Sequence, residues 1–106
     1  MALPAEVDVH SASDLVRTGA LVIDVREAAE LAEARLPDAL HIPMRDFVAR
    51  IAEVPRDRPV LLLCHSGGRS ARVTAYLRAQ GWENVANIAG GIVAWADEID
   101  PSVARP

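Results

Sequence analysis

The chain has one cysteine, four aromatic side chains and no lysine among its 106 residues. A single cysteine cannot form an internal disulfide or a thiolate cage for a metal ion, which leaves a buried structural thiol or a reactive one. No hydrophobic run approaches the roughly 18 residues of a membrane-spanning helix, and the first residues show no pattern of a secretory signal. We therefore expect a cytoplasmic protein that has no membrane partner.

The charge is weakly negative, with a net value of -4, and the eleven arginines are spread along the chain. This distribution offers no basic surface for nucleic acid, so we expect no such partner. His10 and His41 lack the paired spacing of metal ligands, and Trp82 and Trp95 are expected in or near the core. The sequence therefore predicts one domain over residues 1–100, a loose tail over 101–106, no metal site and no cofactor.

Short apolar runs alternate with segments of helical pattern, which predicts parallel strands joined by crossover helices. We expect strands at 6–10, 21–25, 39–42, 60–63 and 85–88. Helices are expected at 11–19 with Ser11 as the cap, and at 27–34, 44–51, 70–80 and 92–95. The predicted fold is a three-layer α/β/α domain with a central, mainly parallel sheet, whose active edge lies at the carboxyl ends of the strands.

The cysteine stands where a buried strand gives way to a loop and a helix, because residues 60–70 read VLLLCHSGGRS. A cysteine after an apolar strand is more often a small core residue than a nucleophile. Here, however, Gly67 and Gly68 allow the backbone to curl around a bound atom. The amides at the helix start and the cation Arg69 both favour the thiolate form. This context predicts that Cys64 is a nucleophile.

These eleven residues resemble the active-site loop of the rhodanese (thiosulfate:cyanide sulfurtransferase) family, in which a strand is followed by Cys-x-x-Gly-x-Arg-Ser and a helix. Three further segments are similar to the family's other signatures and occur in the family's order: VIDVRE at 22–27, LPDALHIP at 36–43 and GGIVAW at 90–95. The chain departs from the pattern at Ala34-Arg35, where the family often has Gly-His, at Asp38, which replaces a glycine, and at His65.

The resemblance implies a rhodanese-like fold and ping-pong sulfur transfer. Cys64 would take the outer sulfur of a small anionic donor such as thiosulfate, hold it as a persulfide, and pass it to cyanide, a thiol or a protein acceptor. The resemblance places that sulfur among the loop residues His65, Ser66, Gly67, Gly68, Arg69 and Ser70. The alternative is a regulatory module, or a sulfur carrier that depends on a partner, built on the same fold.

Loop length separates this chemistry from that of the cysteine phosphatases. Those enzymes have five residues between cysteine and arginine, whereas four separate Cys64 from Arg69 here. The loop is one residue short for the nest that cradles a tetrahedral anion, which favours a single sulfur atom over phosphate or arsenate.

Asp24, Arg26 and Arg35 are candidate supporting residues, and Arg69 is a candidate binding residue. Asp24 and Arg26 follow a buried strand and are expected to brace the loop as a pair, since buried charges require partners. Arg69 either contacts substrate or is tied back to a carboxylate. Arg35 either lines the mouth of the site and attracts an anionic donor, or is an ordinary exposed residue at a helix end.

The polar side chains of the loop itself leave alternatives open. His65 either hydrogen-bonds the donor or projects from the loop. Ser66 and Ser70 offer hydroxyl groups near the sulfur, and Ser70 is also a suitable residue for a helix start.

Overall fold

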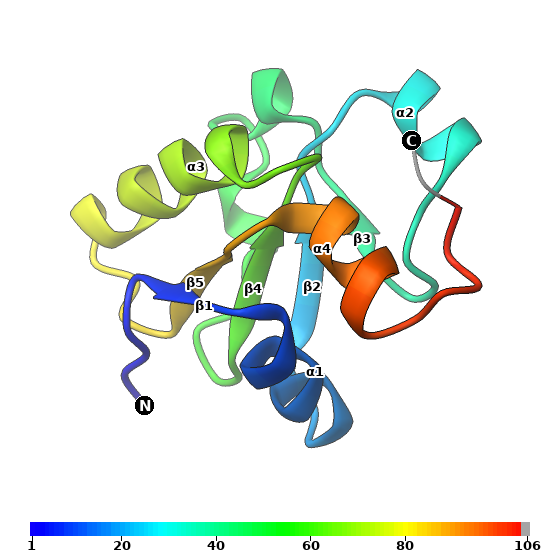
Figure 1. Cartoon of the computed structure of the whole chain (residues 1–106). Coiled ribbons are helices and arrows are strands. Elements are labelled where there is room, and N and C mark those ends of the chain that lie inside the picture. Colours follow the sequence, from blue (N-terminus) through cyan, green and yellow to red (C-terminus); the bar gives the residue numbers. More distant parts are fainter. Residues whose placement is uncertain (105–106) are drawn as a thin grey trace.

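A five-stranded sheet forms the centre of the structure, a computed structural model that describes residues 1–104. The strands are β1 (Glu6–Val7), β2 (Leu21–Asp24), β3 (Leu40–His41), β4 (Val60–Leu63) and β5 (Val85–Ile88), in the spatial order β1-β5-β4-β2-β3 (Figure 1). Every strand pair is parallel. The predicted α/β class is confirmed, and the sheet is wholly parallel.

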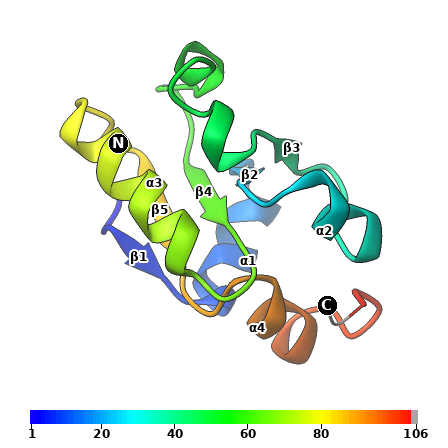
Figure 2. The ribbon, with the colours of Figure 1, turned by 90° about the horizontal axis from the view of Figure 1, so that it is seen from above.

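Four α-helices and two short 3-10 helices surround the sheet: α1 (Val9–Arg17), α2 (Ala28–Glu33), η1 (Met44–Asp46), η2 (Ile51–Glu53), α3 (Gly68–Ala79) and α4 (Gly91–Glu98). Helices α1 and α4 cover one face and α3 covers the other, as seen from above in Figure 2. No helix within residues 1–104 is long and apolar enough to cross a membrane. The three layers of the predicted architecture are present.

The side chains of β4 alternate between the two hydrophobic clusters of the core. Leu61 and Leu63 pack in the cluster beneath α1 and α4, whereas Val60, Leu62 and Cys64 belong to the cluster on the α3 side. This alternation follows from the two-residue period of a strand. It directs the cysteine toward the start of α3.

The first helix begins earlier than expected. Residues 6–10 alternate like a strand, but only Glu6–Val7 is paired in the sheet, and α1 starts at Val9. Its cap is Asp8, whose side chain accepts a hydrogen bond of 2.8 Å from the backbone N–H of Ser11. The prediction of Ser11 as the cap is therefore wrong, because the aspartate three residues before it satisfies that N–H.

The predicted helix over 44–51 is also wrong. The segment forms η1 and η2 with turns between them. Phe47 is buried, as the helical pattern required, but Val48 is 66% exposed. A 3-10 helix has a period of three, so it places Met44 and Phe47 on one face as an α-helix does.

The segment after α4 packs more closely than a loose tail. The backbone N–H of Val103 donates to Asp100 O at 3.1 Å, and the Val103 side chain is buried in the cluster beneath α1 and α4. Residues 105 and 106 of the predicted tail lie outside the described residues. The domain boundary at residue 100 stays a prediction.

Candidate active site

Cys64 directly follows the last residue of β4 and opens the loop that leads into α3. The strand is completely buried, and the cysteine side chain is 1% exposed. Gly67 caps the helix with a left-handed conformation, φ 112°, which glycine adopts without strain. The chain therefore turns sharply back over the sulfur atom.

Two hydrogen-bond donors point at Cys64 Sγ. The backbone N–H of Gly67 lies 3.1 Å from Sγ, and Ser70 Oγ lies 3.2 Å from it. The pKa of the thiol falls below its ordinary value of 9.0. Burial is the largest single influence and raises the pKa, but the Ser70 hydroxyl and the backbone N–H groups of Gly67, Arg69 and Ser70 together outweigh it. The site thus stabilises a thiolate through directed donors.

The start of α4 fixes the backbone of the cysteine loop. The N–H of Ile92 donates to Cys64 O at 2.9 Å, and the N–H of Val93 donates to His65 O at 3.2 Å. These N–H groups have no partner within their own helix. A Cβ on Gly91 would stand 2.5 Å from Cys64 O, so only glycine permits this approach. The Gly90-Gly91 motif therefore allows the loop to dock on α4.

Asn87 of β5 links the loop to the sheet edge. Its Nδ2 donates to Gly67 O and to Glu6 Oε2, both at 3.2 Å. Its Oδ1 accepts a hydrogen bond from Ser70 Oγ at 2.5 Å. Ser70 has one hydroxyl proton, which it donates at any moment either to Asn87 or to Cys64 Sγ. Asn87 thereby positions the hydroxyl beside the sulfur.

The predicted pair of Asp24 and Arg26 forms and is fully buried. Arg26 donates to both carboxylate oxygens of Asp24, at 2.8 Å through Nη2 and 3.0 Å through Nε. Nη2 also donates to Ala34 O at 2.7 Å, beyond the end of α2. Asp24 ends the strand next to β4, so the pair ties α2 to the sheet beside the cysteine loop.

Arg69 is tied back to a carboxylate, one of the two alternatives left by the sequence. Its guanidinium donates to both oxygens of Glu30 in α2, at 2.7 and 2.8 Å. This interaction lowers the pKa of Glu30 to about 2. The cation thus faces α2. Its backbone N–H lowers the pKa of the Cys64 thiol, and its charge also attracts the thiolate.

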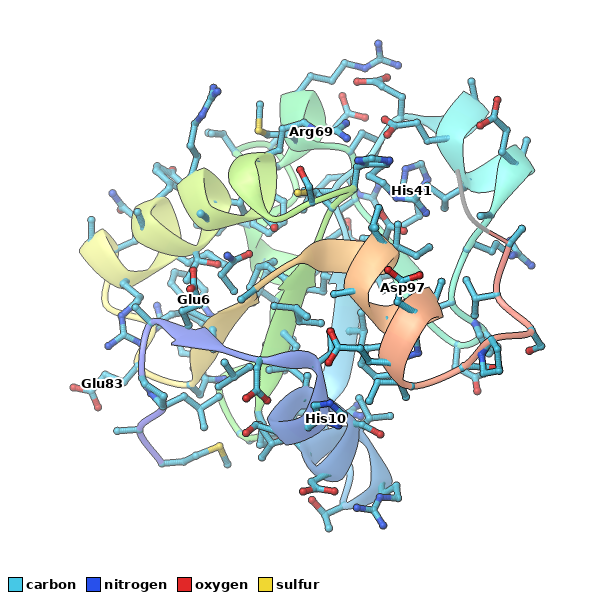
Figure 3. All side chains as sticks on the ribbon, viewed as in Figure 1. Glu6, His10, His41, Arg69, Glu83 and Asp97 are labelled. Atoms are coloured by element: carbon cyan, nitrogen blue, oxygen red, sulfur yellow. The ribbon has the colours of Figure 1, made fainter. Side chains whose placement is uncertain are left out.

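Other predicted residues stay apart from the sulfur. Ser66 is exposed and His65 half-buried, and the side chains of both lack a hydrogen bond within residues 1–104. Arg35 is exposed and makes no hydrogen bond or ion pair with any described residue. The histidines predicted to be structural bond elsewhere: His10 with Glu98, and His41 with Arg26 O. Figure 3 labels His10 and His41 on separate parts of the molecule.

Two residues of the site were not expected from the sequence, Glu30 and Asn87. Asn87 carries a detectable signal, because it is a polar residue inside the otherwise apolar strand VANI, and buried polar side chains need partners. Glu30 is one of three glutamates in an alanine-rich stretch, and nothing in the local pattern distinguishes it. Among the described residues there is no cluster of side chains that could hold a metal ion.

The model of the rhodanese-like domain family matches residues 8–98 of the chain. The chain belongs to this family. Over 101 residues this rhodanese-like domain is 43% identical to a sulfurtransferase of Allochromatium vinosum, covering 93% of this chain and 94% of that protein. It is 32% identical to the thiosulfate sulfurtransferase GlpE of Pseudomonas savastanoi pv. phaseolicola, covering 81% of each.

Solved structures agree with this assignment. The rhodanese-related protein of Thermoplasma volcanium superposes with a TM-score of 0.85 at 25% identity, covering 97% of this chain and all of that one. The expected family and fold are thereby confirmed. The named relatives support sulfur transfer as the general activity of this rhodanese-like domain.

Proposed function

We propose that this chain transfers sulfane sulfur through a persulfide on Cys64, from a donor such as thiosulfate to cyanide, a thiol or a protein. The observation that carries the proposal is the convergence of the Gly67 N–H and the Ser70 hydroxyl on Cys64 Sγ. These donors favour the thiolate, which is the attacking form. The cytoplasmic location expected from the sequence stays a prediction.

The transfer has two steps. In the first, the Cys64 thiolate attacks the outer sulfur of thiosulfate, a bond forms between Sγ and that sulfur, and the donor's S–S bond breaks as sulfite leaves with the electron pair. In the second, cyanide attacks the stored sulfur and leaves as thiocyanate, which returns the thiolate. Splitting one difficult step into two accessible ones is the benefit of covalent catalysis.

The stored sulfur would bear a negative charge and lie above the start of α3. Backbone N–H groups of residues 65–70, which form the loop and the first residues of α3, are suited to stabilise it, as is the positive end of the helix dipole. Asp24 and Arg26 would act as a brace for this loop, since the pair holds α2 beside it. Gly68, Ser66 and His65 would contribute their backbone N–H groups. For Arg35 both alternatives stay open: it attracts an anionic donor, or it is an ordinary exposed residue.

The Arg69 contacts support sulfur transfer over phosphate chemistry. A phosphatase of this loop type needs its arginine directed at the anion, whereas Arg69 is held by both oxygens of Glu30. This agrees with the spacing of Cys64 and Arg69, which is one residue shorter than in the cysteine phosphatases.

Mass spectrometry of the intact protein tests the proposal. Incubation with thiosulfate should add one sulfur atom, and cyanide should remove it with release of thiocyanate. Since Cys64 is the only cysteine, Cys64→Ser should abolish both signals while circular dichroism reports an intact fold. A variant without the thiol that still produced thiocyanate would remove the assigned nucleophile. Addition of sulfur from a protein donor, but not from thiosulfate, would identify the carrier alternative.

A second variant tests loop length. Insertion of one residue between Gly67 and Gly68 should weaken sulfur transfer, because it displaces the Ser70 hydroxyl and the backbone N–H groups of Arg69 and Ser70 from Sγ. Unchanged transfer would show that loop length does not determine the chemistry.

A further inference from the structure

The cation nearest to the cysteine loop is fully engaged by a carboxylate. Arg69 and Glu30 form a two-pronged ion pair at 2.7 and 2.8 Å, and their side chains are 32% and 30% exposed. Figure 3 labels Arg69 at the edge of the sheet where α3 begins. This geometry orients a guanidinium more strongly than a single hydrogen bond would.

Glu30 is itself held in place from two sides. The backbone N–H of Glu27 donates to Glu30 Oε1 at 3.1 Å. The buried Arg26 donates to the backbone oxygen of Glu30 at 3.4 Å. Movement of the carboxylate away from Arg69 would break the first of these contacts. The ion pair is therefore built into the fold and is more than an accidental surface contact.

The second exposed cation of this region is also paired. Arg45 of η1 lies 3.4 Å from Glu27, the residue before α2. Arg72, one turn further along α3, is exposed, where solvent and salt screen its charge. Among the described residues, Arg69 and Arg45 are thus each paired with a carboxylate, whereas the unpaired Arg35 is exposed like Arg72.

We propose that Glu30 determines donor specificity: by neutralising Arg69 it makes the site select low-charge sulfane donors, such as organic persulfides, over the dianion thiosulfate. The proposal rests on the sulfur transfer proposed above. Thiosulfate remains a substrate, but the poorer one. Glu30 acts through Arg69 and has no contact with the reacting atoms.

The two donor classes react by the same step and differ in charge. In each case the Cys64 thiolate attacks the outer sulfur, the Sγ–S bond forms, and the donor's S–S bond breaks. The electron pair leaves on sulfite when the donor is thiosulfate and on a thiolate when the donor is an organic persulfide. Only the first donor brings and releases a dianion, so an unpaired Arg69 would favour it selectively.

The test is the rate of Cys64 persulfide formation with two donors, thiosulfate and the persulfide of 2-mercaptoethanol. Glu30→Gln keeps the size of the side chain and removes its charge. We expect kcat/KM for thiosulfate to rise about tenfold, the change that corresponds to about 1.4 kcal/mol. The gain should appear mainly as a lower KM and should shrink at high salt. Transfer from the organic persulfide should change little.

Two controls isolate the role of Arg69. Asp14→Asn removes the same charge from a residue that pairs with Arg17 within α1, so the preference between donors should stay as in the unmodified chain. Adding Arg69→Gln to Glu30→Gln should cancel the gain. If Glu30 had only a structural role, Glu30→Gln would change kcat/KM for both donors alike. The salt dependence of the reaction with thiosulfate would then be unaltered.

The outcomes separate this inference from the function on which it rests. If Glu30→Gln still takes sulfur from the organic persulfide but gains nothing with thiosulfate, the specificity inference is overturned and sulfur transfer stands. If the unmodified chain takes sulfur from neither donor, both are overturned.

Discussion

Removal of the Ser70 hydroxyl should raise the pKa of the Cys64 thiol. Ser70 Oγ lies 3.2 Å from Sγ and is the strongest of the influences that lower this pKa. A hydrogen bond to a charged group contributes about 1.5–3 kcal/mol, and the length of this one favours the low end. Since about 1.4 kcal/mol corresponds to one pKa unit, Ser70→Ala should raise the pKa by about one unit.

The assay is the rate of alkylation of Cys64 by iodoacetamide as a function of pH. At a pH below both pKa values, Ser70→Ala should react about tenfold more slowly because its thiolate fraction is about tenfold smaller. Ser66→Ala is the matched comparison for the pKa, since Ser66 is exposed and has no hydrogen bond to Sγ. An unshifted pKa in Ser70→Ala would refute the view that this hydroxyl holds the thiolate. The variant should also lose some stability, because Asn87 Oδ1 loses its donor.

Three further predictions concern the frame of the site. Arg26→Met should lower the free energy of unfolding by about 3–5 kcal/mol in urea denaturation, because Asp24 keeps a buried and unpaired charge; a loss below about 1 kcal/mol would contradict this. Gly91→Ala should lower the Tm and slow alkylation of Cys64, since its Cβ would overlap Cys64 O. A Cβ at Gly68 meets nothing within 4 Å, so Gly68→Ala should leave the Tm nearly unchanged. The depressed pKa of Glu30, about 2 against an ordinary 4.5, should stabilise the protein above pH 4.5 and cease to do so as pH falls through 2. At neutral pH, Glu30→Gln should therefore have a free energy of unfolding about 1–2 kcal/mol lower than that of the unmodified chain, after allowance for solvent screening. Below about pH 2 the two should be equal. A difference that stayed constant across pH would contradict a stabilising Glu30–Arg69 pair.

The periodic parts of the fold were predictable from the sequence. The strand Val60–Leu63 is a continuous apolar run, typical of a strand buried on both faces of a parallel sheet, and the structure has the same bounds. The position of Cys64 followed from that strand and from the glycines after it. Local signals were sufficient here because strand, turn and helix start are adjacent in the chain.

The predictions that were wrong or incomplete concern places where two residues could fill the same role, or where the contacting residues lie far apart in the sequence. At the first helix the local pattern predicted Ser11 as the cap, but Asp8, which is an equally good capping residue, takes that place. The Arg69 contact joins residues 39 positions apart, so its partner among several carboxylates depended on how α2 packs. The polar Asn87 could have been recognised as needing partners, but their identity required the sheet order.

The docking of the cysteine loop on α4 makes the reactivity of Cys64 depend on residues that are synthesised after it. The groups that anchor Cys64 O and His65 O belong to Ile92 and Val93, which leave the ribosome long after the cysteine itself. Asn87, which positions the Ser70 hydroxyl, is also a late residue. A nascent chain that ends before residue 90 therefore carries a thiol without its anchors, with the ordinary reactivity of an unfolded cysteine. The thiol acquires its activated state only after Ile92 and Val93 have been made and have docked on the loop.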